Sequence, residues 1–547
     1  MKLNRYSILA LGALAVVSCS DMDEQIQEGS YLSADQMQES TEAIPERVDA
    51  AFAGMYNMMG EPYSVFGASE RADDWGIPMI MLSLDAEGSD LWMANSGYNW
   101  FSTCGEFSSR DANYANPYIR YVLPYKQIGI INEFVASIAA DTQDENLIYK
   151  LAQARAMRAF DYMLLVPYFQ FNYQTSKDLP SIPVLSAGVD YANNPRASVE
   201  TVYSLIMDDL DYAVGALEGF ERTNKAHIDQ KVAYGLRARA YMNMGMYAEA
   251  AADAAKAIEG YTPATMEELA AGSRFCDINE ANWMWGVTLT EDQVRNGVLA
   301  TPASWFSPFS GTGYSAACAV TPSINTLLYD KIPATDVRKQ WWLDENCYSP
   351  LLETTTWNGV TGIDIATLVI EDWKVPFTPY NNVKFTMKDG TGSTFNSSDY
   401  PLMRVEEMIL VEIEGLAKSG STGEAQTKLE NFVKTYRDPN YSATASGRTL
   451  EDEIWYQRRV ELWGEGFAVS DLMRLNKPMV RFHDTNPGSF PDAFAFNMAA
   501  DDPWRLMRFP QTEMNTNAGI VDNEGGHIPE PGQNPGLRDG VTNAEFK

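Results

Sequence analysis

The chain has few of the residues that most often bind metals, with 3 histidines and 5 cysteines among 547 residues. Cys19 lies near the N-terminus, and the other cysteines are isolated in the sequence: Cys104, Cys276, Cys318 and Cys347. None of them forms a Cys-x-x-Cys motif or lies beside a histidine, as the ligands of structural zinc do. The sequence therefore predicts no metal site and no cofactor, although a structural calcium ion and the pairing of the cysteines stay open.

Basic residues are also scarce, because 41 Lys and Arg stand against 74 Asp and Glu, for a net charge of -33. A nucleic acid is bound through many cationic contacts to its phosphates, so this balance argues against a nucleic-acid partner. It argues equally against direct electrostatic binding to anionic lipid headgroups. The acidity itself is typical of a well-solvated protein surface.

The motifs of the common enzyme classes are missing as well. The chain has no Gly-x-Ser-x-Gly elbow, no P-loop, no dinucleotide-binding fingerprint and no His-Glu-x-x-His. Its many carboxylates could include the acid pair of a glycosidase, but such a pair is defined by its geometry across a cleft and not by spacing. We therefore expect a protein that is not an enzyme and has no catalytic residues.

Long apolar runs are absent, and the run at the N-terminus, Ile8–Val17, is too short to span a bilayer, which takes about 20 residues. Lys2 and Arg5 precede it and Cys19 follows it, in the order of a secretory signal peptide. A cysteine directly after small residues resembles a bacterial lipobox. We therefore predict a lipoprotein signal peptide at residues 1–18 and lipidation of Cys19, with an ordinary signal peptide as the alternative.

The next residues, 19–45, are polar and acidic. Within them, Ser20-Asp21-Met22-Asp23-Glu24 resembles the signal that directs lipoproteins of Bacteroidetes-type bacteria to the cell surface. We expect this segment to be a tether, and the protein to be anchored to the membrane through its lipid without spanning it.

Hydrophobic periodicity predicts a mostly α-helical protein with little β structure, in one large domain over residues 46–547. The clearest segment, Arg237–Ile258, places small residues and tyrosines around a turn at Gly245, as a tetratricopeptide (TPR) helix pair does. Looser patterns complete a set of four degenerate TPR pairs, near residues 147–217, 230–260, 402–435 and 450–475. Because one pair cannot bury its own apolar face, we expect the pairs to stack into a superhelical scaffold.

The last of these pairs contains the charged segment QRRVELWGEGFAVSDLMRL, residues 457–475. Arg458 and Glu461 are three residues apart, a spacing that suits an ion pair within one helix, and Asp471 and Arg474 repeat it. We predict such pairs, and not an active site, in a helix over Leu450–Leu475. Two glycines in it, Gly464 and Gly466, fit either close packing or a break in the helix.

Two long stretches, near residues 60–125 and 262–400, have weak periodicity and hold most of the 13 tryptophans. Loops this long inside a compact protein are usually functional, so we predict that these regions bind the ligand. In SDLWMANSGYNWF, residues 89–101, aromatic rings stand among small polar residues, a mixture that binds sugars by stacking and hydrogen bonding. The candidate ligand-binding residues are Trp92, Asn95, Tyr98, Asn99, Trp100, Trp283, Trp285, Trp305 and Trp341. For any single tryptophan, the alternative to ligand binding is burial in the core. Of Trp92 and Trp100, we expect one to expose a ring face and the other to hold the loop in place.

Five blocks in order resemble the SusD/RagB family of outer-membrane nutrient-binding lipoproteins. They are AQARAMRAFDYMLLVPYF, EEMILVEIEGLAKSGSTGEAQTKLENFVKTY, RRVELWGEGFAVSDLMRL, RFPQTEMNTNAGI and QNPG. The resemblance implies a non-enzymatic cell-surface protein that caps a SusC-like TonB-dependent transporter, binds an oligosaccharide and delivers it for import. In the family the TPR helices mainly face the transporter and the ligand lies on the opposite, loop-built face, where residues 92–100 fall. A peptide-binding, RagB-like lipoprotein or a scaffolding lipoprotein of the same fold is the alternative.

Overall fold

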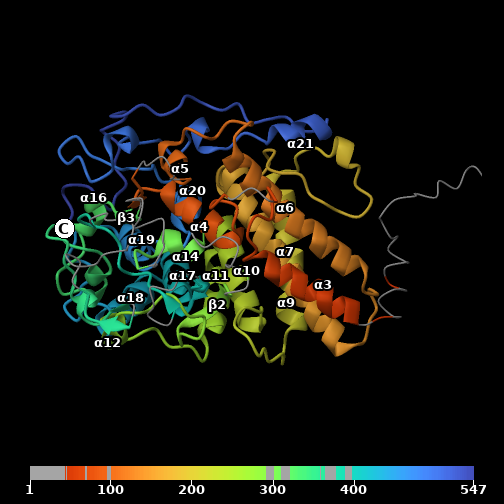
Figure 1. Ribbon diagram of the computed structural model, residues 1–547, viewed down its shortest axis with the longest axis horizontal. Helices are drawn as coiled ribbons and strands as arrows, with labels where there is room; N and C mark the ends of the chain where they lie inside the picture. The colour runs from red at the N-terminus through yellow and green to blue at the C-terminus, as the bar shows by residue number, and fades with distance from the viewer. Residues whose placement is uncertain are drawn as a thin grey trace, which may run out of the picture.

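The computed structural model describes residues 46–67, 71–94, 100–290, 301–309, 321–357, 359–363, 377–388 and 397–547, with Gln38, Ile44 and Gln293. Long helices dominate these residues and the strands are short (Figure 1). The prediction of a mostly helical fold with little β structure is confirmed.

The longer helices are α3 (Glu46–Met58), α4 (Gly76–Ala86), α6 (Ala115–Ala136), α7 (Glu145–Phe169), α9 (Val199–Ala216), α10 (Gln230–Met244), α11 (Tyr247–Ile258), α17 (Val405–Lys418), α18 (Thr422–Tyr436) and α19 (Leu450–Glu461). The shorter ones are α5 (Ser102–Glu106), α8 (Tyr173–Ser176), α12 (Met266–Leu269), α14 (Pro302–Phe306), α16 (Thr326–Tyr329), α20 (Ala468–Arg474) and α21 (Gln511–Thr516). Short 3-10 helices cover Tyr191–Asn193 (η1), Val337–Trp341 (η2), Pro350–Glu353 (η3), Asp492–Phe494 (η5) and Pro503–Arg505 (η6). Three antiparallel strand pairs join β1 (Leu91–Trp92) to β3 (Ser323–Ile324), β2 (Trp283–Val287) to β6 (Tyr400–Arg404), and β4 (Thr356–Trp357) to β5 (Val360–Thr361).

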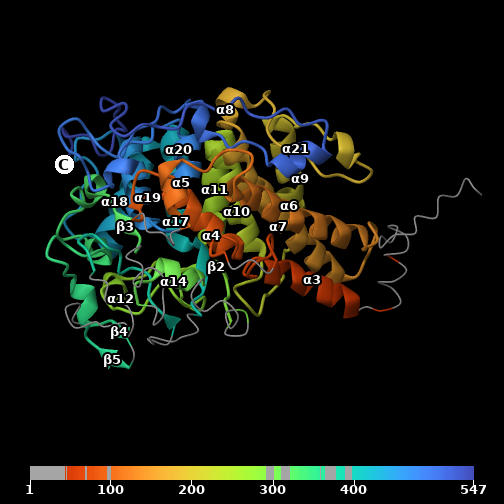
Figure 2. The same cartoon turned by 45° about the horizontal axis from the view of Figure 1, so that its top comes forward.

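Successive long helices pack side by side. The contacts join α6 to α7, α7 to α9, α9 to α10, α10 to α11, α11 to α17, and α17 to both α18 and α19. Figures 1 and 2 show this row running from α3 and α6 through α10 and α11 to α18 and α19. The predicted helix pairs lie in this row, and their order fits the expected superhelical stack. One hydrophobic core extends through most of the row, and a second core lies between α17, α18 and α19.

Small residues set the close packing of α10, α11 and α17. Gly245 ends α10 with a φ of 77°, and a Cβ there would lie 2.1 Å from Nε2 of Gln174. Ala250 of α11 has no exposed surface, and a Cβ on Gly415 of α17 would lie 2.6 Å from the carbonyl oxygen of Tyr247. A Cβ on Gly415 would hold α17 away from α11, whereas at Gly245 the left-handed φ is what favours glycine at the turn between α10 and α11.

The stretch 60–125 is more helical than its sequence predicts. It contains α4, α5 and the first part of α6. Every residue of α4 is buried, so this helix has no polar face and shows no helical period in its hydrophobicity. The longer α6 carries Pro124 in its interior and has only a weak apolar stripe. The prediction of an irregular segment was wrong here because amphipathic periodicity detects only helices with one solvated face.

The predicted helix Leu450–Leu475 is broken into α19 and α20. Gly464 and Gly466 have φ values of 81° and 87°, in the left-handed region that side chains with a Cβ rarely adopt. The turn redirects the chain into α20, which packs against α4 and α7, and Arg458 of α19 pairs with Asp471 of α20 at 3.0 Å and not with Glu461. The predicted pair of Asp471 and Arg474 is confirmed at 2.8 Å.

Glu461 instead lies in a buried charge cluster that joins five segments of the chain. Its carboxylate accepts hydrogen bonds from Arg437 Nε at 2.7 Å, Arg404 Nη1 at 3.2 Å and Arg338 Nη1 at 3.2 Å. Burial opposes ionisation of Glu461, but the neighbouring guanidinium groups outweigh it and hold its pKa well below the usual value. The buried charge cluster comprises Arg338, Lys384, Arg404 and Arg437 with Asp336, Glu406, Glu461 and Glu465, so that four positive charges meet four negative ones.

Asp161 is a second buried ionisable group, but no opposite charge among the described residues compensates it. Asp161, in the middle of α7, has no exposed surface, and within the described part of the chain neither carboxyl oxygen has a hydrogen-bond partner. Burial raises the pKa of this carboxyl well above its usual value. The folded-state pKa of Asp161 therefore lies above the unfolded value of about 3.9. As the pH rises from about 3.9 toward the folded-state pKa, the free energy of unfolding falls, because the unfolded chain releases this proton more readily than the folded one.

Replacing Asp161 with leucine, which branches at the same carbon, should raise the free energy of unfolding at pH 8 by about 1–3 kcal/mol. The gain should shrink at pH 5, because the destabilisation of the parent by its buried carboxyl grows as the pH rises above the unfolded pKa of about 3.9. Urea unfolding at both pH values measures the difference. The control, Asp141→Leu at an exposed position, should change stability by less than about 0.5 kcal/mol. A loss of stability in Asp161→Leu at pH 8 would show instead that the carboxylate has a partner.

Candidate functional site

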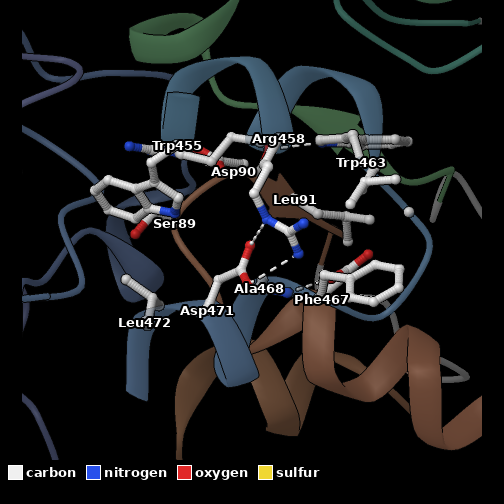
Figure 3. Close-up of a pocket in the computed structure, with 14 residues that line it drawn as sticks. Ser89, Asp90, Leu91, Trp455, Arg458, Trp463, Phe467, Ala468, Asp471 and Leu472 are labelled. Carbon is white, nitrogen blue, oxygen red and sulfur yellow. Dashed lines mark hydrogen bonds and ion pairs between the residues drawn. The ribbon is translucent and has the colours of Figure 1, made fainter. Parts of the chain in front are cut away.

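The aromatic loop that begins at Ser89 is held at its base by α19. Arg459 donates to both carboxylate oxygens of Asp90, from Nε at 2.8 Å and from Nη2 at 2.7 Å. The indole N–H of Trp463 donates to the carbonyl oxygen of Asp90 at 3.1 Å. Figure 3 shows the Ser89–Leu91 segment beside Trp455 and Trp463, with Arg458 turned toward Asp471 of α20. Charge-assisted bonds from a rigid helix therefore fix where the loop starts.

Trp92 anchors the next part of the loop. Its backbone pairs with Ser323 in the β1–β3 ladder, and its indole N–H donates to Oγ of Ser489 at 3.3 Å. The same hydroxyl accepts from the backbone N–H of Thr326 at 3.0 Å. The half-buried ring of Trp92 thus ties together three segments that are far apart in the sequence, which agrees with the expectation that one of the two loop tryptophans holds the loop.

Trp100, at the far end of the loop, belongs to a row of half-buried rings near the surface. The guanidinium carbon of Arg71 lies 4.6 Å from the centre of the Trp100 ring and 5.3 Å from that of Phe66. The ring of Phe66 lies 5.2 Å from that of Tyr118 on α6. We call Phe66, Arg71, Trp100 and Tyr118 the aromatic row. All four are partly exposed, so this row combines apolar ring area with a cation at the protein surface.

Arg71 is held in position by Asp73. Its Nε and Nη2 donate to the two oxygens of that carboxylate at 3.1 Å and 2.8 Å. Burial raises the pKa of Asp73, and the charge of Arg71 offsets part of this effect. Nη1 of Arg71 has no hydrogen-bond partner among the residues that the structure describes, and the side chain is 22% exposed. Two donors are thus committed to the protein while others can bind a ligand.

The remaining sequence candidates divide into two groups. Asn95, Tyr98 and Asn99 lie outside the described residues. Four other candidates are at most 1% exposed: Trp283, Trp285, Trp305 and Trp341. The prediction that these four offer ring faces to a ligand is wrong, because they pack in the core, as Trp285 does edge-on against Phe160 with ring centres 5.0 Å apart. Their strands and short helices are buried on both faces, which the local sequence does not reveal.

Three residues of the aromatic row were missed from the sequence. Phe66 and Arg71 precede α4 in a segment that looked irregular, and Tyr118 lies on α6. Phe66 is positioned by Asp74, whose carboxylate accepts from the backbone N–H groups of Val65 at 3.1 Å and Phe66 at 2.8 Å. In the sequence, the pattern that could have indicated these residues is an aromatic residue and an arginine within a turn-rich stretch. This pattern is too common to identify a binding site.

Two smaller cavities in the helical part of the protein are too small for a saccharide. The one in Figure 3, between Asp90, Trp455 and Asp471, has a volume of about 30 Å³. Another, between α7, α10 and α20 and lined by Met163, Met242 and Phe467, measures about 80 Å³. Ligand pockets usually measure about 300–1,000 Å³, and the smaller of these cavities has room for little more than a water molecule.

The described residues contain no group of three or more His, Cys, Asp or Glu side chains arranged to hold a metal ion. None of the helices in the described part of the chain is long and apolar enough to cross a membrane. Cys104, Cys276 and Cys347 are free thiols.

Comparison with protein families shows what the chain is related to. A family described as "Starch-binding associating with outer membrane" matches residues 33–242, and one described as "SusD family" matches residues 323–525. The chain belongs to the SusD family. The two matches come from the two halves of this SusD-like protein, and they confirm the resemblance inferred from its sequence blocks. No curated protein sequence matches it significantly.

Solved structures share the fold of this SusD-like chain. A SusD-like carbohydrate binding protein from Bacteroides vulgatus aligns with a TM-score of 0.68 and 22% identity, over 87% of this chain and 97% of its own. A laminarin binding SusD-like protein aligns with a TM-score of 0.59 and 17% identity, over 88% and 99%. Surface glycan-binding protein A from Bacteroides thetaiotaomicron aligns with a TM-score of 0.62 and 16% identity, over 88% and 98%.

Proposed function

We propose that this SusD-like protein binds an oligosaccharide at the bacterial surface without acting on it chemically. In this proposal it delivers the oligosaccharide to a SusC-like TonB-dependent transporter for import through the outer membrane. The observation that carries the proposal is the aromatic row, where the partly exposed ring of Trp100 lies against the guanidinium of Arg71 at 4.6 Å.

The chemistry of the aromatic row suits a sugar. A pyranose ring has an apolar C–H face that packs on an aromatic ring and a rim of hydroxyl groups that need hydrogen bonds. Trp100 supplies the ring, and the free N–H donors of Arg71 supply hydrogen bonds in a fixed orientation, because Asp73 holds the guanidinium from the other side. The segment that leads to Trp100 starts from a fixed point, since Arg459 of α19 holds Asp90 and Ser489 holds Trp92.

The relatives support this function. Proteins with the same fold are named for binding laminarin and surface glycans, and one matching family is described as starch-binding and associated with the outer membrane. In our proposal the chain reaches that membrane through a lipid on Cys19, with residues 19–45 as the tether. Asn95, Tyr98 and Asn99 are proposed to complete the sugar site beside Trp92 and Trp100.

Affinity electrophoresis of the mature domain through gels containing neutral polysaccharides tests the proposal. At least one polysaccharide should retard the protein relative to a non-binding standard, and prolonged incubation with it should produce no new reducing ends. Retardation by none of them, together with tight binding of peptides, would contradict glycan binding and favour the peptide-binding alternative. New reducing ends would contradict the absence of catalysis.

A further inference from the structure

An open polar groove lies between the α9–α10 connection and the segments that flank β2. Its volume is about 960 Å³, at the upper end of the usual range for ligand sites. Residues 217–225 form one wall, the start of α10 forms another, and Tyr261, Asn279 and Thr288 complete it. The groove shares no lining residue with the aromatic row, so it is a separate site.

The groove gathers positive charge on a strongly acidic protein. Two carboxylates line it, Glu221 and Asp229, in a chain whose net charge is -33. Asp229 is already committed, since it pairs with Arg222 at 2.9 Å and also caps α10 by accepting from the backbone N–H of Val232 at 2.9 Å. The cationic lining residues are Arg222, Lys225, Lys231 and Lys388.

Two of these cations have no carboxylate partner within the described residues. Lys225 Nζ donates only to the carbonyl oxygen of Glu280, at 2.6 Å, and Lys231 Nζ lies 5.6 Å from the centre of the Tyr261 ring. Burial and the charge of Arg222 lower the pKa of Lys225. Lys225 is therefore partly desolvated and lies near another positive charge, an arrangement that a bound anion would stabilise. Arg222 and Lys388 are already paired with Asp229 and Asp399, both at 2.9 Å.

We propose that this groove binds an acidic saccharide, with Lys225 and Lys231 holding its carboxylate or sulfate group. The Tyr261 ring lines the groove beside Lys231. Asn224, Gln230 and Asn279 already bond Ala226, Val214 and Asp277, and their remaining amide donors and acceptors are the groups proposed to bind the hydroxyls. The size of the groove favours several linked sugars over a simple anion, which would fill a small part of it. The inference rests on the proposed function only in taking the ligand to be a glycan.

The test uses the mature domain and its double variant Lys225→Gln/Lys231→Gln, with polygalacturonate as the carboxylated probe and a sulfated polysaccharide as the second. The variant should bind at least one of the two about tenfold more weakly, and its affinity for a neutral polysaccharide should stay within twofold. The matched control Lys428→Gln/Lys434→Gln removes the same charge from two lysines of α18 that are 39% and 45% exposed. This control should change no affinity by more than twofold.

Each other outcome overturns the inference in a different way. Equal losses in both double variants would show only a general charge effect, and equally tight, lysine-dependent binding of polyglutamate would show an anionic site without sugar selectivity. Loss of acidic-saccharide binding in Trp100→Ala alone would place that ligand on the aromatic row. Binding of neutral but not acidic polysaccharides would overturn this inference and leave the proposed function intact, whereas binding of no polysaccharide would overturn both.

Discussion

Replacement of Glu461 by glutamine should lower the free energy of unfolding by about 3–5 kcal/mol. The carboxylate lies within 3.2 Å of nitrogen atoms of Arg338 and Arg404 and within 2.7 Å of one of Arg437, and none of these side chains is exposed. Glutamine keeps the volume but removes the negative charge that the guanidinium groups share. Because water cannot reach them, the excess positive charge stays buried and uncompensated. Urea denaturation followed by circular dichroism measures the loss.

A control and a pH series separate this effect from a general effect of losing charge. Glu451 forms an ion pair with Lys418 at 2.8 Å but is 57% exposed, so Glu451→Gln should cost less than about 1 kcal/mol. The pKa of Glu461 is lowered in the fold, so its stabilisation is present above the unfolded value of about 4.3 and is lost as the pH falls further. Equal losses in the two variants at pH 7 would contradict a central role for the buried charge cluster.

Replacement of Trp100 by alanine should weaken glycan binding about 30-fold, or ~2 kcal/mol, the size of effect that a central aromatic contact has at an interface. The substitution removes the ring against which Arg71 is stacked and on which we place the sugar. Since the ring is only half-buried, the melting temperature should change little. Isothermal titration with the polysaccharide that retards the parent protein in gels gives the affinity.

Two further variants distinguish recognition from packing. Arg71→Lys keeps the charge but loses the planar, paired donors, so it should also weaken binding, by about tenfold. Tyr191→Ala removes a ring that is 66% exposed on η1, outside the aromatic row, and should leave affinity within twofold. If Trp100→Ala folds normally and keeps full affinity, the ring is a support for its loop and the sugar site lies elsewhere.

Helices with one solvated face could be predicted from the sequence, because their apolar residues recur every three or four positions. The pair around Gly245 is of this kind, since alanines, tyrosines and the turn glycine record the packing within one short segment. The left-handed glycines Gly464 and Gly466 were visible too, but whether they would break the helix was not. The break depends on the side chains of Phe385 and Met81, which occupy the space where a Cβ would lie.

The sequence by itself determined the family, the helical scaffold and the loop that begins at Ser89. Only the tertiary structure decided which aromatic rings reach the surface and which charges meet. Trp92 and Trp100 share one loop, yet Trp92 hydrogen-bonds Ser489 whereas Trp100 stacks on Arg71. Likewise, Glu461 meets arginines from β6, η2 and the end of α18 and not its near neighbour Arg458. Such contacts join residues that are distant in the chain, and a short sequence pattern carries no record of a partner that lies outside it.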